Sequence, residues 1–347
     1  MAEKGEFLSR KALIIIGITW IAILIIGLIS LIPEVNEAFY SDNSTIRAIF
    51  NAITYLGEPI VFVVIISMLY IVYNKKFAKT LTLSLILSYY LNGIVKEIFQ
   101  DARPDTNIDP TEELGVIESS YGFPSAHTQN AVAFWGYSSY EFKDRKKYQE
   151  IPIIPVVFSV IIFLVSISRI IIGTHDLQDI IGGLLLGIGF LLVFIYLEPT
   201  MTSQFNKLSF NGKIILTVLV SLAFLLIGTL LFPRAYVELA RQNEPPDYPD
   251  AGAFSLVGGV ILGFGVGYLL EQEYVKYNPS ALTIKKKILN LIISLIIIFI
   301  VFLPLEYLIE IDSAFYRFFK YGLTAFTIAF VCPLICTKID LKSKITK

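Results

Sequence analysis

The amino-acid sequence predicts an all-α integral membrane protein, and three observations support that fold class. Hydrophobic residues make up 55% of the 347 residues. Charged residues make up only 16%, whereas an average soluble domain carries about 25%. Apolar runs of roughly 20 residues, the length of a helix that crosses a bilayer, recur along the whole chain.

The same composition excludes other classes of protein. A disordered chain would be more highly charged and less apolar. Two cysteines are too few to staple a secreted disulfide-rich domain, and a formal net charge of −1 does not suit a nucleic-acid-binding surface. We therefore expect the lipid bilayer as the environment of the chain and expect no nucleic-acid partner.

The apolar runs predict ten membrane-spanning helices. They cover residues 12–32, 48–73, 80–99, 125–142, 152–172, 177–197, 214–233, 252–270, 288–309 and 321–337. The first run is longer than the apolar part of a signal peptide and lacks a small-residue cleavage site, so we expect it to be retained. The fourth run contains His127, Gln129 and Asn130, which predicts that it faces protein or a water-filled cavity rather than lipid.

Basic residues predict the orientation of the chain. If the N-terminus is cytoplasmic and the ten helices alternate, the cytoplasmic segments hold 20 of the 28 lysines and arginines, and each of these segments holds at least two. This asymmetry follows the positive-inside rule. It predicts a multi-pass protein of the cell membrane with both termini in the cytoplasm.

Polar residues cluster at three predicted helix ends on the outer side. In the first cluster, Lys96 and Arg103 are seven residues apart, so two helical turns would place them on one face, and Pro104 favours the end of the helix. In the second cluster, Ser125 precedes a predicted helix and is a good N-cap residue. The unpaired backbone N–H groups at that helix start would favour an anion.

The third cluster contains Arg169, His175 and Asp179. His175 and Asp179 are four residues apart, which on a helix is close enough for a hydrogen bond between imidazole and carboxylate. Because the clusters share one side, Lys96, Arg103 and Arg169 can converge on one anion, and three cations suit a phosphate. The chain has only two histidines, both lie in these clusters, and together they suit a nucleophile and a proton donor.

Metal binding is the alternative interpretation of the histidines. Together with the nearby Asp176 and Asp179, they contain the ligand types that zinc prefers. The lysine and arginines of the same clusters would repel a cation. We therefore expect no metal ion and no other cofactor.

At these residues the sequence resembles the type 2 phosphatidic acid phosphatase (PAP2) superfamily, whose signature is K-x6-RP, then PSGH, then SR-x5-H-x3-D. Residues 96–104 and 168–179 fit the first and third blocks with the family spacing. The second block, residues 124–127, has Ala126 where glycine is usual. The extra methyl group would be harmless on a helical or extended backbone and would cost about 1–2 kcal/mol at a positive φ.

The resemblance implies a six-helix PAP2-type bundle over residues 1–200, followed by an extension of about four helices over residues 201–347 whose role it does not give. It implies that His175 attacks phosphorus and forms a phosphohistidine, and that Asp179 holds the tautomer of His175. It implies that His127 protonates the leaving group and then activates water. The residues that would bind the phosphoryl oxygens are Lys96, Arg103, Ser125, Ala126 through its N–H, and Arg169. The family requires no metal ion.

The resulting prediction is a phosphatase that acts on a lipid-linked phosphate or diphosphate at the outer membrane face. Candidate substrates are phosphatidate, phosphatidylglycerophosphate and polyprenyl phosphate or diphosphate. One alternative is a phosphotransferase of the same superfamily, and another is a transporter, although no pattern of paired broken helices indicates one. The acidic segment 105–118, beside the predicted anion site, is expected to form a solvated lid.

Two glycine-rich helix faces predict close helix packing. Gly259, Gly263 and Gly267 follow one another at four-residue intervals, as do Gly183 and Gly187. We expect these faces to pack helices within one chain, and a homodimer formed through them is the alternative.

Overall fold

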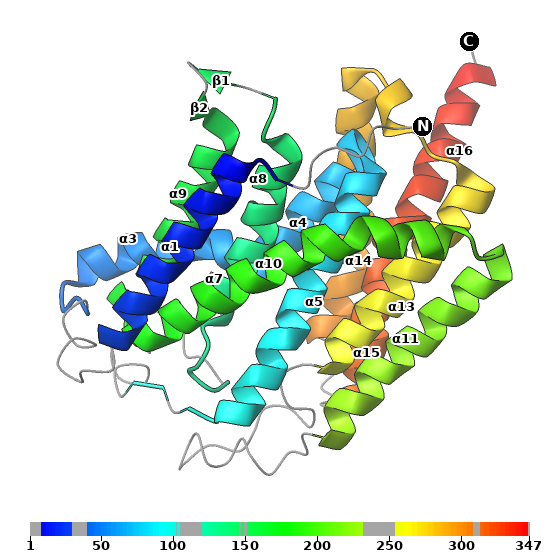
Figure 1. The fold of residues 1–347 in the computed structure, drawn as a ribbon. Helices are drawn as coiled ribbons and strands as arrows, with labels where there is room; N and C mark the ends of the chain where they lie inside the picture. The colour runs from blue at the N-terminus through cyan, green and yellow to red at the C-terminus, as the bar shows by residue number, and fades with distance from the viewer. Residues whose placement is uncertain are drawn as a thin grey trace. The chain divides into compact units, whose positions relative to one another are not determined.

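The computed structural model describes residues 8–29, 40–101, 103–104, 120–145, 147–148, 151–231, 254–307 and 313–345, which are almost entirely helical (Figure 1). The described strands, β1 (Lys147–Tyr148) and β2 (Ile151–Pro152), form a short antiparallel pair. Among the described residues, seven helices are long and apolar enough to cross a membrane, or up to eight if one broken pair counts as a single span. The predicted all-α, multi-pass membrane class is confirmed, and the count of ten spans stays a prediction.

The chain folds as two compact units. The first consists of Met1–Pro59 and Ile98–Ser203, and the second of Ile60–Glu97 and Gln204–Lys347. The boundary near residue 200 that the sequence predicts stays a prediction. The compact units group residues 60–97 with the C-terminal part of the chain.

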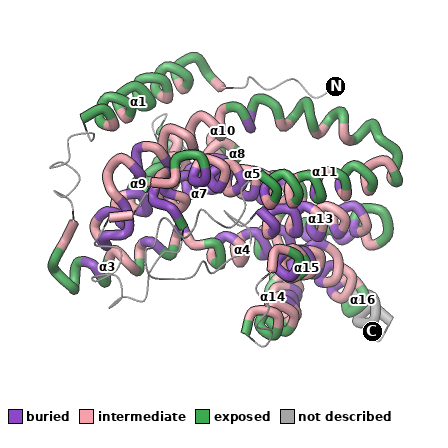
Figure 2. The backbone as a smooth tube through the Cα atoms, turned by 90° about the horizontal axis from the view of Figure 1, so that it is seen from below, coloured by how far each residue is buried: buried purple, intermediate pink, exposed green. Residues whose placement is uncertain are grey.

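The first unit contains the N-terminal helices and those around both histidines. They are α1 (Arg10–Ile29), α3 (Ser44–Thr54), the 3-10 turn η2 (Tyr55–Gly57), α7 (Ala126–Ala131), the π-helical turn η5 (Val132–Gly136), α8 (Tyr137–Phe142), α9 (Ile153–Ile171) and most of α10 (Leu177–Asn206). Helix α1 has no buried residue, as its green and pink colouring in Figure 2 shows. A helix that is apolar all round and exposed in this way suits a position against lipid.

The second unit contains the remaining helices. They are α4 (Pro59–Met68), η3 (Leu69–Tyr73), α5 (Lys75–Phe99), α11 (Phe210–Leu231), α13 (Phe254–Leu270), η8 (Glu271–Val275), η9 (Pro279–Ala281), α14 (Ile284–Tyr307), α15 (Ala314–Phe326), η10 (Thr327–Val331) and α16 (Cys332–Ile345). Its hydrophobic core includes the contact of α5 with α13, where the rings of Tyr90 and Phe254 meet edge to face with centroids 5.0 Å apart. Aromatic pairs of this geometry add to the stability from burial alone.

The second predicted span, residues 48–73, is not one continuous helix. Helix α3 begins at Ser44, η2 ends at Gly57, and a new helix begins at Pro59. Glu58 between them has an extended backbone, with φ −78° and ψ 141°. Proline has no N–H for the helical ladder and disfavours helical dihedrals in the residue before it, which accounts for the break. An apolar count over the window could not detect this interruption.

The fourth predicted span forms α7, η5 and α8 in succession. Its polar residues Gln129 and Asn130 are buried, which confirms that this segment faces protein. Two glycines of α10 allow this segment to pack closely against that helix. A Cβ built on Gly183 would lie 2.8 Å from the Ser125 carbonyl oxygen, and a Cβ built on Gly187 would lie 3.2 Å from the Gln129 carbonyl oxygen. These two glycines therefore pack helices of the same chain.

The glycines of α13 have a similar role in the second unit. Gly259 and Gly263 lie directly against the backbone of α15, and Gly267 lies against Ala329. A side chain on Gly263 would overlap the carbonyl group of Gly322. Both glycine-rich faces thus serve packing within the chain, and a homodimer stays a prediction.

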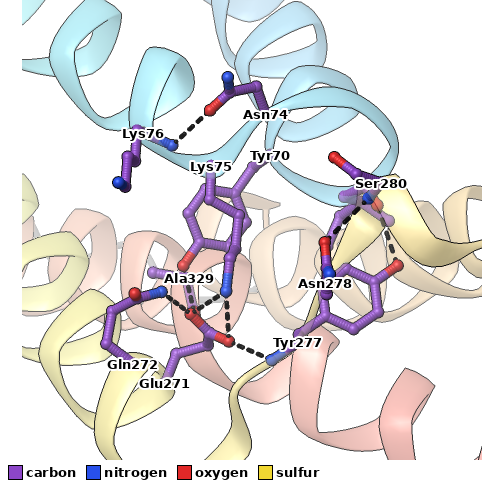
Figure 3. A network of polar contacts seen from close by, with 11 residues as sticks. Tyr70, Asn74, Lys75, Lys76, Glu271, Gln272, Tyr277, Asn278, Ser280 and Ala329 are labelled. Carbon is purple, nitrogen blue, oxygen red and sulfur yellow. Dashed lines mark hydrogen bonds and ion pairs between the residues drawn. The ribbon is translucent and has the colours of Figure 1, made fainter. Parts of the chain in front are cut away.

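A buried ion pair joins the first residue of α5 to the first residue of η8 in the second unit (Figure 3). Glu271 is fully buried, and its two carboxylate oxygens accept hydrogen bonds from Lys75 Nζ at 2.8 and 2.7 Å. The backbone N–H of Tyr277 and the side-chain amide of Gln272 each donate to the same carboxylate at 2.7 Å. Lys276, with φ 55°, turns the chain back so that Tyr277 can reach Glu271.

Tyr277 extends this network to two further elements. Its Oη donates to the Ile71 carbonyl at 2.9 Å and accepts a hydrogen bond from Asn290 Nδ2 at 3.1 Å. Asn74 caps the start of α5, because its Oδ1 accepts from the N–H groups of Lys76 and Phe77. The network therefore joins η3, the start of α5, the start of η8 and α14.

Candidate active site

The centre of the site is a buried pair formed by His175 and Asp179. His175 Nδ1 lies 2.8 Å from Asp179 Oδ2, and each side chain is only 1% exposed. The backbone N–H of Asp176 donates to the same carboxylate oxygen at 3.3 Å. The predicted hydrogen bond between residues i and i+4 is therefore present, with Asp179 in the first turn of α10.

A turn at Gly173, between α9 and α10, positions His175 beside Asp179. Gly173 follows α9 with φ 89°, a conformation that only glycine adopts readily. Its N–H donates to the Ile170 carbonyl at 3.0 Å, and the N–H of Thr174 donates to the Arg169 carbonyl at 3.1 Å. The chain thereby closes the end of α9 and enters α10 within a few residues, with Thr174, the residue before His175, hydrogen-bonded to Arg169.

Arg103 binds the other nitrogen of the same imidazole. Its Nη1 lies 3.0 Å from His175 Nε2 and donates to the Thr174 carbonyl at 2.8 Å. Its Nε donates to the Ser120 carbonyl at 2.6 Å. Because a guanidinium group can only donate, Nε2 is the acceptor, and the network assigns the ring hydrogen to Nδ1, facing Asp179. This tautomer leaves a lone pair on Nε2 beside a cation.

Ser125 joins the second motif to the third. It is the N-cap of α7, with its side-chain oxygen 3.5 Å from the N–H of Thr128, so the predicted cap is confirmed. Its own N–H donates to the backbone carbonyl of Asp179 at 3.0 Å. Ala126 is the first helical residue after the cap, and the described non-glycine residues with positive φ are Gln100 and Lys276. The methyl group of Ala126 therefore brings no backbone strain.

His127 has a carboxylate partner that the sequence did not indicate. Its Nε2 lies 3.0 Å from Glu58 Oε1. Glu58 comes from the break between η2 and α4, far from any of the three clusters in sequence. The available signal was the segment Gly57-Glu58-Pro59, where a charged residue interrupts an otherwise apolar run.

Arg169 and Lys96 occupy different units. Arg169 is fully buried at the end of α9, and its Nη1 donates to Thr54 Oγ1 at 2.9 Å. Lys96 is buried in the last turn of α5, within the second unit. The first unit thus brings together Arg103, His175, Asp179 and the start of α7. The approach of Lys96 to these residues stays a prediction.

Two further expectations concern the surroundings of the site. The acidic segment 105–118 lies outside the described residues. Within the described ranges, no group of three or more His, Cys, Asp or Glu side chains is placed to hold a metal ion. Each of the two histidines instead contacts one carboxylate.

Two protein-family models match the chain. Residues 77–203 match the model described as PAP2 superfamily. Residues 255–344 match the model described as PAP2 superfamily phosphatase, transmembrane extension. The first match contains the three predicted motifs, and the second falls in the C-terminal helices.

Three curated proteins are similar to parts of the chain. Lipid phosphate phosphatase delta of Arabidopsis thaliana is 24% identical over 273 residues, which cover 76% of this chain and 60% of the relative. Phosphatidylglycerophosphatase B of Bacillus subtilis is 33% identical over 100 residues, covering 28% and 46%. Undecaprenyl-diphosphatase of Sulfolobus acidocaldarius is 25% identical over 162 residues, covering 46% and 75%. The chain thus spans less than two thirds of the length of the first two.

Proposed function

Because the chain belongs to the PAP2 superfamily, we propose that it is a membrane phosphatase that hydrolyses a lipid-linked phosphate or diphosphate monoester through a phosphohistidine intermediate. The observation that carries the mechanism is the position of His175 between Asp179 on Nδ1 and Arg103 on Nε2. An imidazole held in this tautomer has its nucleophilic lone pair on Nε2, where an arginine can bind a phosphoryl oxygen.

In the first step, His175 Nε2 attacks phosphorus. The N–P bond forms as the bond to the lipid oxygen breaks, and His127 gives a proton to that oxygen. Asp179 stabilises the positive charge on the imidazole ring. Negative charge on the transferring phosphoryl group is stabilised by a set of donors. This set consists of Lys96, Arg103, Ser125, the N–H of Ala126, and Arg169.

In the second step, water attacks the phosphohistidine. His127, now neutral, takes a proton from the water as its oxygen bonds to phosphorus, and the N–P bond breaks to release inorganic phosphate. The histidines end the cycle in their starting protonation states. This return is why two histidines suffice for the whole reaction.

The lipid class follows from the position of the site in a membrane-embedded chain. Polar motifs at helix ends suit a substrate whose headgroup lies at the membrane surface while its chains stay in lipid. The named activities of the three relatives concern a lipid phosphate, a phosphatidylglycerophosphate and a polyprenyl diphosphate. They support a phosphate or diphosphate on a lipid anchor as the shared feature of the substrate.

We expect the purified full-length chain in detergent to release inorganic phosphate from at least one lipid of a panel. The panel contains phosphatidate, phosphatidylglycerophosphate and a polyprenyl diphosphate, and the readout is free phosphate. EDTA should leave the rate unchanged, because the nucleophile and the proton donor are histidines. Activity that EDTA abolishes would contradict the mechanism. Transfer of the phosphoryl group to an added alcohol, without free phosphate, would identify a phosphotransferase instead.

The proposed location of the site is the outer membrane face, with both termini in the cytoplasm. Two exposed positions test this: Asp42, in the predicted outer segment after α1, and Asp144, in a predicted cytoplasmic segment. An impermeant thiol reagent should label Asp42→Cys on intact cells and Asp144→Cys only after permeabilisation. The native Cys332 and Cys336 are buried, so the parent chain should give little background. The reverse labelling pattern would show that the orientation is inverted.

A further inference from the structure

We propose that Glu58 is a positioning residue for His127, an inference that rests on the proposed role of His127 as proton donor. Glu58 Oε1 lies 3.0 Å from His127 Nε2, across 69 residues of sequence. Glu58 lies outside the three signature blocks. The contact engages Nε2 of the imidazole ring and fixes the orientation of that ring.

The backbone around Glu58 is shaped to hold it in place. The N–H of Glu58 donates to the Tyr55 carbonyl at 3.1 Å, which closes the turn. Pro59 follows with a fixed φ and starts the next helix. Trp135 Nε1 donates to the Leu56 carbonyl at 3.1 Å and ties the turn to η5. Hydrogen bonds on two sides and a proline therefore limit the positions that the Glu58 backbone can take.

Gly57 brings this turn against the imidazole. A Cβ built on Gly57 would lie 2.7 Å from Val165 Cγ1 and 3.3 Å from His127 Cδ2. A larger residue would displace one of these side chains. The absence of a side chain at position 57 thus lets the backbone beside Glu58 lie in contact with the ring that Glu58 binds.

The Glu58 carboxylate, 3.0 Å from His127 Nε2, suits an imidazole ring that must donate a proton. The side chains of His127 and Glu58 are 11% and 27% exposed, so solvent competes only partly for their contact. The hydrogen bond holds the ring in one orientation, and the negative charge balances the protonated ring. His175 has the matching arrangement with Asp179. Each histidine of the site therefore has its own carboxylate partner.

The test compares two leaving groups. An alkyl phosphate needs a proton on its departing alkoxide, whereas an aryl phosphate of equal chain length departs as a stable phenoxide with little help. In the purified full-length chain, Glu58→Gln keeps the side-chain length and removes the charge. We expect it to lower kcat on the alkyl phosphate about 10- to 100-fold and to leave KM nearly unchanged, since general acid catalysis contributes about 10²- to 10⁴-fold. Release of the phenol in a single turnover should stay at the wild-type rate.

Three controls make the result decisive. Asp144→Asn removes an exposed carboxylate and should behave as wild type in both assays. Glu58→Asp keeps the charge and should retain more activity on the alkyl phosphate than Glu58→Gln. Thermal unfolding of each variant separates loss of fold from loss of proton transfer. An equal loss on both substrates, or no loss on either, would overturn the role of Glu58. A wild-type chain that hydrolyses neither substrate would instead contradict the proposed function.

Discussion

Replacing His175 with alanine is expected to lower kcat for phosphate release from a lipid phosphate by at least about 10³-fold, because removal of a nucleophile leaves only binding and charge stabilisation. The chain has one other histidine, and it faces Glu58 rather than Asp179. The measurement is steady-state phosphate release by the purified variant in detergent.

Trapping of the intermediate gives this prediction a direct readout. Substrate labelled with radioactive phosphorus should place acid-labile, base-stable label on the wild-type chain and none on the His175→Ala variant. Asp179→Asn keeps the shape of the pair but can present the wrong hydrogen to Nδ1, and a loss of up to about 10⁴-fold is expected from the analogous change in a catalytic triad. Asp144→Asn is the matched surface control. Wild-type activity in His175→Ala would refute the phosphohistidine.

Removing the Glu271 carboxylate is expected to have the largest effect on stability. Glu271→Ala leaves the Lys75 ammonium group without its partner and the Tyr277 N–H without an acceptor. Loss of one partner from a buried ion pair costs about 3–5 kcal/mol. Lys75 retains some access to solvent, with 13% of its side chain exposed, so we expect the lower end of this range. The measurement is the midpoint of thermal unfolding of the purified chain in detergent.

A double-mutant cycle isolates the pair from its surroundings. Lys75→Met alone should also destabilise the chain, because it leaves Glu271 buried with an unbalanced charge. Combining Lys75→Met with the same Glu271→Ala change should recover part of the loss, since two uncharged side chains need no ionic partner. Glu273→Gln, at an exposed neighbouring position, is the control, and its midpoint of thermal unfolding should equal that of the wild type. Losses that simply add in the double variant would show that the ion pair itself contributes nothing.

Local features of the fold and the site could be predicted from the sequence. Apolar runs located most helices, because a membrane helix needs a minimum length of apolar residues whatever its neighbours. The pairing of His175 with Asp179 follows from helical spacing alone. The cap at Ser125 follows from its residue type before a helix, and the helical start explains why Ala126 is tolerated there.

Long-range pairings could not be predicted in this way. Glu58 and His127 are 69 residues apart, and Lys75 and Glu271 are 196 apart, so no periodic pattern connects them. The break at Pro59 was missed for a related reason, since a hydropathy window averages one proline with its apolar neighbours. Both pairs join charged side chains that are far apart in the sequence, and a buried charge needs a partner that can come from anywhere in the chain.

In the proposed mechanism, the contact between Arg103 and His175 Nε2 occupies the lone pair of the nucleophile until the substrate arrives. An incoming phosphate that takes over the guanidinium group exposes that lone pair in the same movement. A neutral lipid alcohol offers the arginine no comparable anion and leaves the imidazole capped. Under this proposal, recognition of the anion and exposure of the attacking nitrogen are one event, which the product alcohol does not trigger.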